Sequence, residues 1–445
     1  MPLRRGIAAL IVLLVVVPLT TASQATAAPT ADEKSGNITR LAQVPIMMGK
    51  DLKADGSDMV FKGNLAVTGT YEGIGFFRIL PQAPYLKQLS FYQCPASQDD
   101  VSIIGHYLIV SIDSPGSNSV KNGVCNNTDD SAGKEGIRIV DISNPKQPRQ
   151  VKFVETDCGS HTHTVVPDGA KTYVYIESYP LGVPTATCSP ASHRKISVVE
   201  FPTNDPTKAK VIGTPDVTPE IGCHDITIFP ERHLAGAACI GETDIWDIKD
   251  PAHPVTLSRI YNPAIMIHHG TGFTWDGKYL AIGDEFAGSI TGECAGNSHS
   301  TAGALWFYDI TDPTSPSLAG YYNVPRTQAP KDTSESYIAC TTHVFGVVPT
   351  RDPKSYIATV AYRSSGLSVV DFSDPMNPKE IGYYMQTDKL PDLWCAYWYN
   401  GRIYTNDLNS KLGVTVYQMD GLDRQHVHDY RGIMNPQVQV PNFAD

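Results

Sequence analysis

Four histidines occur at one repeated step of the sequence, and imidazole side chains at matching positions indicate a metal site. His161, His224 and His343 each stand six residues before a proline, and His269 stands six residues before Trp275. Each precedes a short apolar run that is typical of a strand ending in a turn. Neutral imidazole is a common metal ligand and suits copper, iron, manganese and zinc. The shared step therefore predicts that the four side chains bind one transition-metal ion, with copper or iron favoured.

Other reactive side chains stand near this step, and we expect them to act on a small-molecule substrate. A carboxylate beside the ion completes the metal shell or serves as a general base, and we assign this catalytic role to Glu285 and Glu177. Asp225 follows His224, and strand alternation points its side chain to the other face. The alternative for each residue is a structural role. The residues expected to bind substrate are His163, His268, Tyr362, Arg363 and Cys395.

A repeated strand-and-turn unit explains why the histidines recur. Its clearest copies are residues 136–148, 244–254, 305–316 and 367–378, each an apolar strand followed by Asp, a polar–Asp/Asn–Pro turn and a second proline. A unit of about four short strands cannot bury both faces of its sheet, whereas units stacked radially hide those faces. Weaker copies at 75–86, 197–208 and 414–423 bring the count to seven. The repeats predict an all-β fold, a single seven-bladed β-propeller, with the histidines at the mouth of its channel.

The best copy of the unit, IRIVDISNP at residues 137–145, resembles the LVIVD-repeat family of exported bacterial β-propeller proteins. The resemblance covers nearly the whole mature chain and implies the fold, but a shared fold does not imply a function. The histidine arrangement is also similar in architecture to carotenoid-cleaving oxygenases, copper-dependent methanethiol oxidases and some manganese-dependent oligosaccharide lyases. The full motifs of those enzymes do not occur in this sequence.

The first 27 residues are typical of an export signal. Two arginines at positions 4 and 5 precede a 13-residue apolar stretch at 7–19, and small residues at 25–27 form a cleavage site. The apolar stretch is too short for a comfortable membrane span. We expect cleavage near Ala27 and a secreted or extracytoplasmic chain with no membrane attachment. In the expected organisation, residues 28–56 lead into the first blade, 57–425 form the propeller and 426–445 form a C-terminal tail.

Charge and cysteine content limit the partners. The formal net charge of −11 argues against nucleic acid, which needs a basic surface, and we expect a monomer. Nine cysteines in an exported chain should be mostly paired, with at least one left over. Cys223 with Cys239, and Cys158 with Cys188, are candidate pairs, and Cys395 is the candidate for the unpaired thiol.

Long loops are expected to cover the histidine face of the propeller. They lie at 113–135, 178–194 and 286–303, are rich in small and polar residues, and each contains one cysteine. Loops of this length in a compact domain usually have a function. Disulfides would hold them in place above the mouth, so we expect a covered pocket there.

Three classes of function compete. The favoured one is a metal-dependent oxidoreductase, because an ion held by neutral imidazoles keeps its positive charge and suits redox or Lewis-acid chemistry. The second is a non-catalytic binding propeller for a cell-wall, polysaccharide or protein partner. The third is a lyase or hydrolase that uses the metal or a His–carboxylate pair. The sequence contains no Gly-x-Ser-x-Gly elbow for a serine nucleophile.

Overall fold

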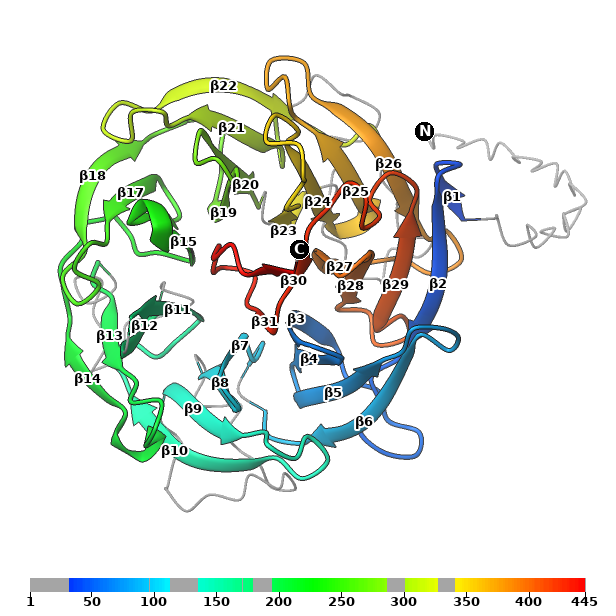
Figure 1. The fold of residues 1–445 in the computed structure, drawn as a ribbon, viewed down its shortest axis with the longest axis horizontal. Helices are drawn as coiled ribbons and strands as arrows, with labels where there is room; N and C mark the ends of the chain where they lie inside the picture. The colour runs from blue at the N-terminus through cyan, green and yellow to red at the C-terminus, as the bar shows by residue number, and fades with distance from the viewer. Residues whose placement is uncertain are drawn as a thin grey trace, which may run out of the picture.

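Seven antiparallel sheets are arranged around one axis in the computed structural model (Figure 1). The structure describes residues 32–95, 97–112, 135–169, 171–178, 194–285, 301–326 and 341–444. This arrangement confirms the predicted all-β, seven-bladed propeller. The predicted signal segment and most of the three long loops lie outside the described residues, so those predictions stay open.

Each blade has four strands, and the first strand of each blade lies next to the channel (Figure 1). Blade one contains β3 (Gly56–Lys62), β4 (Leu65–Thr70), β5 (Gly73–Ile79) and β6 (Leu86–Tyr92). Blade two contains β7 (Val101–Ile104), β8 (Tyr107–Ile112), β9 (Gly136–Asp141) and β10 (Arg149–Glu155). Blade three contains β11 (Thr162–Asp168), β12 (Lys171–Glu177), β13 (Ser197–Glu200) and β14 (Lys210–Gly213). Blade four contains β15 (Asp225–Phe229), β16 (Leu234–Ala238), β17 (Thr243–Asp247) and β18 (Val255–Ile260).

The remaining blades follow the same order. Blade five contains β19 (His268–Phe273), β20 (Tyr279–Asp284), β21 (Leu305–Asp309) and β22 (Ser317–Tyr322). Blade six contains β23 (Thr342–Val347), β24 (Ile357–Tyr362), β25 (Gly366–Asp371) and β26 (Lys379–Met385). Blade seven contains β27 (Leu393–Tyr399), β28 (Arg402–Asp407) and β29 (Val414–Met419). Short 3-10 helices are η1 (Pro206–Lys208), η2 (Pro230–Arg232) and η3 (Arg363–Ser365), and no helix among the described residues is long and apolar enough to cross a membrane.

The N-terminal segment closes the ring. Strand β2 (Ile38–Val44) pairs with β29 and forms the outer strand of blade seven, and the two strands run side by side in Figure 1. Strand β1 (Glu33–Lys34) adds to the outer edge of blade six by pairing with β26. The described part of the segment 28–56, which the sequence predicts to lead into blade one, therefore supplies the fourth strand of blade seven and a fifth strand of blade six.

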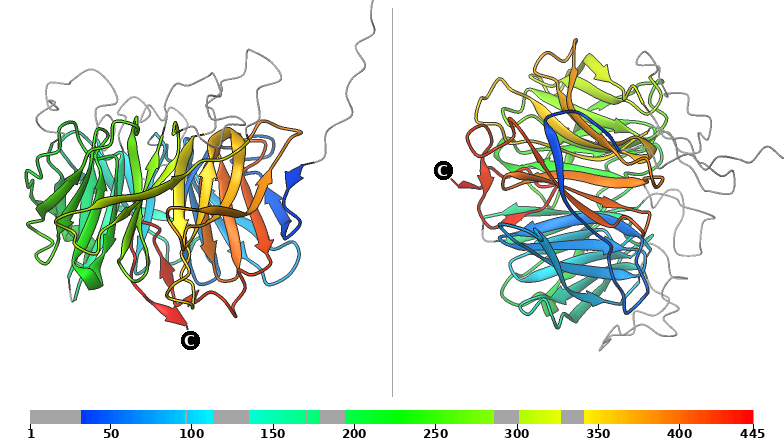
Figure 2. Two further views of the ribbon diagram at one scale, coloured as in Figure 1. Left: turned by 90° about the horizontal axis from the view of Figure 1, so that it is seen from above. Right: turned by 90° about the vertical axis from the view of Figure 1, so that its right-hand side faces the viewer.

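The C-terminal tail crosses the channel at the end opposite the histidines. The Gln439 side chain accepts a hydrogen bond from the Phe273 N–H at 2.6 Å and donates to the Phe273 carbonyl at 2.7 Å, at the last residue of β19. Asn435 binds the backbone of Ile103 in the same two-sided way. Figure 2 shows the C-terminus on one face of the ring. The tail contains β30 (Asp429–Tyr430), β31 (Ile433–Met434), which pairs with the end of β3, and β32 (Phe443–Ala444), which pairs with β30.

In blades two, four, five and six the repeated Asp forms the turn between the third and fourth strands. Oδ1 of Asp141 accepts the Ser143 N–H at 2.9 Å, and Asp309 and its Thr311 partner repeat the contact at 2.8 Å. Such side-chain turns are one reason why Asp is favoured between strands. The turn motif that reveals the repeats is therefore a local hydrogen-bonded structure at the outer edge of these four blades.

Candidate metal centre

The structure brings the four predicted histidine ligands into one contiguous row. His161 and His224 directly precede β11 and β15, and His269 and His343 are the second residues of β19 and β23. Neighbouring ring centroids lie 4.5 Å apart for His161–His224, 4.0 Å for His224–His269 and 4.4 Å for His269–His343. None of the four side chains is more than 6% exposed. Four consecutive blades thus place an imidazole on the same arc of the channel mouth.

Hydrogen bonds between blades hold the inner strands in this register. The Thr164 hydroxyl donates to the Ile226 carbonyl of the next blade at 2.6 Å, and the Thr227 hydroxyl donates to the Thr271 carbonyl at 2.6 Å. The Thr162 hydroxyl also donates to the backbone carbonyl of His224. Because these bonds join inner strands directly, they fix the height of one histidine relative to the next.

Two of the histidines and one carboxylate form the most compact set. The ligand atoms of His224, His269 and Glu285 all lie within 4.8 Å of one another, close enough to bind a metal ion together. Glu285 Oε2 lies 3.4 Å from His269 Nε2, and its Oε1 lies 3.6 Å from His343 Nε2. His161 Nε2 lies 3.0 Å from His224 Nε2. His161 and His343 therefore flank the compact set on either side.

Burial keeps the imidazoles of His224, His269 and His343 neutral. Desolvation lowers the pKa of His224 well below its usual value, and His269 and His161 lower it further. Desolvation, with the charge of Arg363, likewise lowers the pKa of His269 and His343. Neither ring nitrogen of His269 makes a hydrogen bond within the described residues, although the side chain is only 1% exposed. Buried polar atoms usually have partners, so this imidazole fits a metal ligand better than a structural residue.

Arg363 holds the carboxylate of the compact set in place. Its Nη2 lies 3.1 Å from Glu285 Oε1, and its Nη1 lies 2.9 Å from Asp392 Oδ1. The guanidinium stacks 4.7 Å from the ring centroid of Trp394, which itself contacts His343. The sequence predicts that Arg363 binds substrate, but in the structure both terminal nitrogens bind carboxylates. Asp392 and Trp394 were not predicted, because they lie on blade seven, which lacks the histidine.

A small chamber lies between the histidines and the C-terminal tail. Three carboxylates, Asp58, Asp100 and Asp225, line it together with Gln437 of the tail. Its volume is about 20 Å³, enough for about one water-sized molecule. Burial, together with Asp100, raises the pKa of Asp58 to about 8. Burial and the other two carboxylates also raise the pKa of Asp225 well above its usual value.

The placement of Asp225 differs from the expectation that it points away from His224. Both residues line the chamber, because His224 precedes β15 and strict alternation begins only within the strand. A signal for two of these acids is present in the sequence. Asp225 directly follows His224, and Asp58 directly follows Ser57, which stands at the histidine position in blade one.

The two additional histidines lie between blades rather than in the chamber. His163 Nδ1 lies 3.0 Å from Asp100 Oδ2 and 2.8 Å from the Ser111 hydroxyl. His268 Nδ1 lies 2.7 Å from the Thr243 hydroxyl. Both side chains are 0% exposed. One ring nitrogen of each residue is thus hydrogen-bonded, Nε2 of each is buried without a hydrogen-bond partner among the described residues, and neither residue lines the chamber described above.

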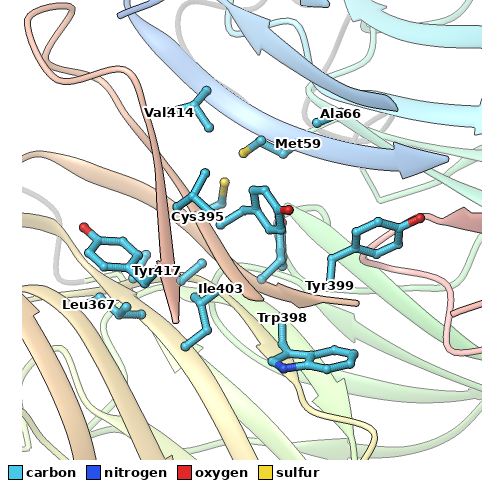
Figure 3. Packing of buried hydrophobic residues seen from close by; sticks show 14 of the residues in the cluster. Met59, Ala66, Leu367, Cys395, Trp398, Tyr399, Ile403, Val414 and Tyr417 are labelled. Atoms are coloured by element: carbon cyan, nitrogen blue, oxygen red, sulfur yellow. The ribbon is translucent and has the colours of Figure 1, made fainter. Parts of the chain in front are cut away.

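Three further predicted residues are buried away from the compact set. Glu177 is 0% exposed, accepts a hydrogen bond from the Thr162 hydroxyl at 3.4 Å, and has its pKa raised by burial and by Asp225. The Tyr362 hydroxyl donates to the Tyr322 carbonyl at 3.4 Å inside the core between blades five and six. Cys395 packs in the apolar cluster shown in Figure 3 with Met59. Tyr362 and Cys395 therefore serve packing, because their strands turn them towards the neighbouring blade.

The cysteines follow the predicted pairing where the structure describes them. Cys223 and Cys239 form a disulfide, as predicted. Among the described cysteines Cys395 is the free one, and it is buried. Cys158 is disulfide-bonded, but its predicted partner Cys188 lies outside the described residues.

The comparisons with known proteins agree with the fold. The LVIVD repeat family matches residues 132–156, 303–324 and 356–386. These three segments, in blades two, five and six, carry the predicted LVIVD repeat, and the arrangement of the sheets shows the seven-bladed β-propeller. No curated protein sequence matches it.

Two solved structures are similar in fold. Hydrazine synthase from Kuenenia stuttgartiensis aligns with a TM-score of 0.53 at 14% identity, over 84% of this chain and 99% of that one. A protein of unknown function from Desulfotomaculum acetoxidans DSM 771 aligns with a TM-score of 0.48 at 10% identity, over 76% and 87%. At 14% identity the likeness to hydrazine synthase shows the fold alone.

Proposed function

We propose that the protein is an exported metalloenzyme that binds one transition-metal ion at the channel mouth and acts as an oxidoreductase on a small organic substrate. The observation that carries the proposal is the compact, buried set of His224, His269 and Glu285. Two imidazoles and one carboxylate with open positions are the donors of non-haem Fe(II) oxygenases. Iron is therefore the first candidate, copper the second because of the flanking histidines, and manganese and zinc follow.

The residues around the set have distinct roles in this proposal. The neutral imidazoles of His224 and His269 supply lone pairs, while Arg363 orients Glu285 through the 3.1 Å contact. A bound redox metal would supply the site for activating dioxygen or substrate. Because the tail crosses the far end of the channel, we propose that substrate approaches from the histidine face.

Metal analysis of matched variants tests the site. We expect one iron or copper ion per chain in the protein as purified or after anaerobic reconstitution, and loss of that ion in His269→Ala. His268→Ala is the control, because this neighbour is equally buried but bonded to Thr243, so it should retain the metal. If the wild-type chain binds none of the four metals, the histidine row is a structural repeat and a binding propeller replaces the enzyme.

The redox assignment needs a separate measurement. We expect the metal-loaded protein to show an electron paramagnetic resonance signal after oxidation with ferricyanide and to lose it after reduction with dithionite, and His269→Ala to show no such signal. A bound ion that gives no change under reduction or oxidation would favour lyase or hydrolase chemistry instead.

Export, and the state of the mature chain, are part of the same proposal. We propose cleavage near Ala27 and a monomer outside the cytoplasm. N-terminal sequencing of the protein from its native compartment, with light scattering, tests both. A chain that retains residues 1–27, or a dimer, would overturn the corresponding statement.

A further inference from the structure

The disulfide between Cys223 and Cys239 lies beside the first ligand of the compact set. Cys223 directly precedes His224 in the chain, and Cys239 directly follows Ala238. The Ala238 carbonyl accepts the backbone N–H of His224 at 2.7 Å. The covalent bond therefore joins the two backbone segments that meet at His224, immediately before β15 begins and immediately after β16 ends.

The same bond reaches the second ligand through Ile240. Ile240 follows Cys239, its N–H donates to the His268 carbonyl at 3.2 Å, and its carbonyl accepts the His268 N–H at 2.8 Å. His269 is the next residue, so this bridge fixes the backbone at the start of β19. Ile240 has a φ of 62°, which a β-branched residue rarely adopts unless its surroundings impose it. The disulfide on one side and His268 on the other supply that constraint.

The two sulfur atoms are not ligands themselves. Cys223 is 2% exposed and Cys239 is 0% exposed, and both belong to the apolar cluster that includes Trp246. Any effect of this pair on a metal ion must therefore act through the backbone of His224 and His269.

We propose that Cys223 and Cys239 are positioning residues of the metal centre, and that their oxidation state sets its affinity for the ion. This inference rests on the proposed function. Reduction by a dithiol transfers two electrons and two protons to the pair, which gives two thiols and the cyclic disulfide of the reductant. The backbone link between the two ligands is then held by hydrogen bonds alone. Partners that orient metal ligands typically change affinity about 10- to 100-fold, and we expect a loss of that size.

A double variant, Cys223→Ala/Cys239→Ala, tests the inference with Co²⁺ as the probe. Its dissociation constant, from chelator competition, should be about 10- to 100-fold higher than that of the wild type, and the Co²⁺ absorption bands should shift. Removing a disulfide also costs about 2–5 kcal/mol of stability. The control is therefore Ile139→Ala, a fully buried blade-two residue whose truncation costs a similar amount and should leave both readouts unchanged.

A reduction experiment and a second variant complete the test. Wild-type protein is treated with a dithiol until thiol titration shows that the buried pair is reduced, and the dithiol is then removed without oxygen. This reduced protein should bind Co²⁺ as weakly as the double variant, and the same treatment should change the affinity of the double variant little. Ile240→Gly removes the constrained side chain at a φ that glycine adopts readily. This variant should therefore fold, and its affinity for Co²⁺ should be several-fold lower than that of the wild type. Wild-type affinity in either variant refutes the positioning role alone, whereas absence of Co²⁺ binding in the wild type refutes the metal site and this inference with it.

Discussion

Asp58→Asn should stabilise the protein at neutral and alkaline pH. Asp58 is 4% exposed, and its carboxylate accepts hydrogen bonds from the Tyr397 hydroxyl at 2.6 Å and from Gln437 at 3.2 Å. Burial and the nearby Asp100 raise its pKa from 3.8 to about 8. Between these two values the folded protein holds a proton that the unfolded chain has released. Stability at this residue therefore falls as the pH rises through that range and is unaffected below it.

The size of the effect follows from the pKa difference. A difference of one pKa unit corresponds to about 1.36 kcal/mol. The pH range from the unfolded pKa of 3.8 to pH 7 spans about three units, so the destabilisation at pH 7 has an upper limit of about 4 kcal/mol. Asparagine has no proton to lose. Gln437 Oε1 makes no hydrogen bond, so a rotated Gln437 amide can accept one from the new Asn side chain. We expect a gain of about 2–4 kcal/mol at pH 7–8 and almost none at pH 4.

Urea unfolding of the metal-free protein from pH 4 to pH 8.5 measures this difference. The control is Asp51→Asn, an exposed residue, which should give the same unfolding free energy as the wild type at every pH. A stability difference between Asp58→Asn and the wild type that does not change with pH would refute the argument. So would a variant that is less stable than the wild type at pH 8.

Two further predictions concern the tail and the free thiol. Gln439→Ala should lower the unfolding free energy by about 2–4 kcal/mol in urea, because it leaves the Phe273 N–H and carbonyl buried without their partner. Gln425→Ala, at an exposed residue, should have no effect, and an unchanged Gln439→Ala would show that these two hydrogen bonds contribute nothing to stability. Cys395 should resist iodoacetamide in the folded protein and react in guanidinium, because it is buried and burial raises its pKa. Mass spectrometry of the peptide that contains Cys395 measures the labelling, and equal labelling in both states would contradict the buried position of this thiol.

The repeats made the fold predictable, and they also explain what the sequence could not reveal. Asp141 and Asp309 begin local turns, so the motif that contains them is visible without knowledge of the tertiary structure. Strand β2 has no such turn, and its place in blade seven depends on pairing with β29 at the other end of the chain. The contacts that Asn435 and Gln439 of the C-terminal tail make with Ile103 and Phe273 are likewise long-range, and no local sequence pattern indicates them.

The site was predictable where chemistry followed the repeat register. The four histidines occupy matching positions of the repeat, so the sequence predicts that they lie together. Trp394 and Asp392 belong to blade seven, which has no histidine at that position, so the repeat gives no sign of them. Tyr362 and Cys395 are predicted to bind substrate because Tyr362 ends a second strand and Cys395 lies near the histidine position of blade seven. Their direction is set by packing between blades, which the sequence period alone does not specify.

Closure of blade seven by β2 also imposes an order on folding. Ile38 pairs with Met419, so one of the first strands to be synthesised must wait for the last strand of the last blade. Pairings between such distant residues form slowly, and an unpaired strand is a template for pairing with other chains. Blades three to six have their own four strands, so the histidine row can assemble while the ring is still open. Assembly of the histidine row and closure of the ring are therefore separate events, and a chain cut before β29 would expose two open edges while retaining all four histidines.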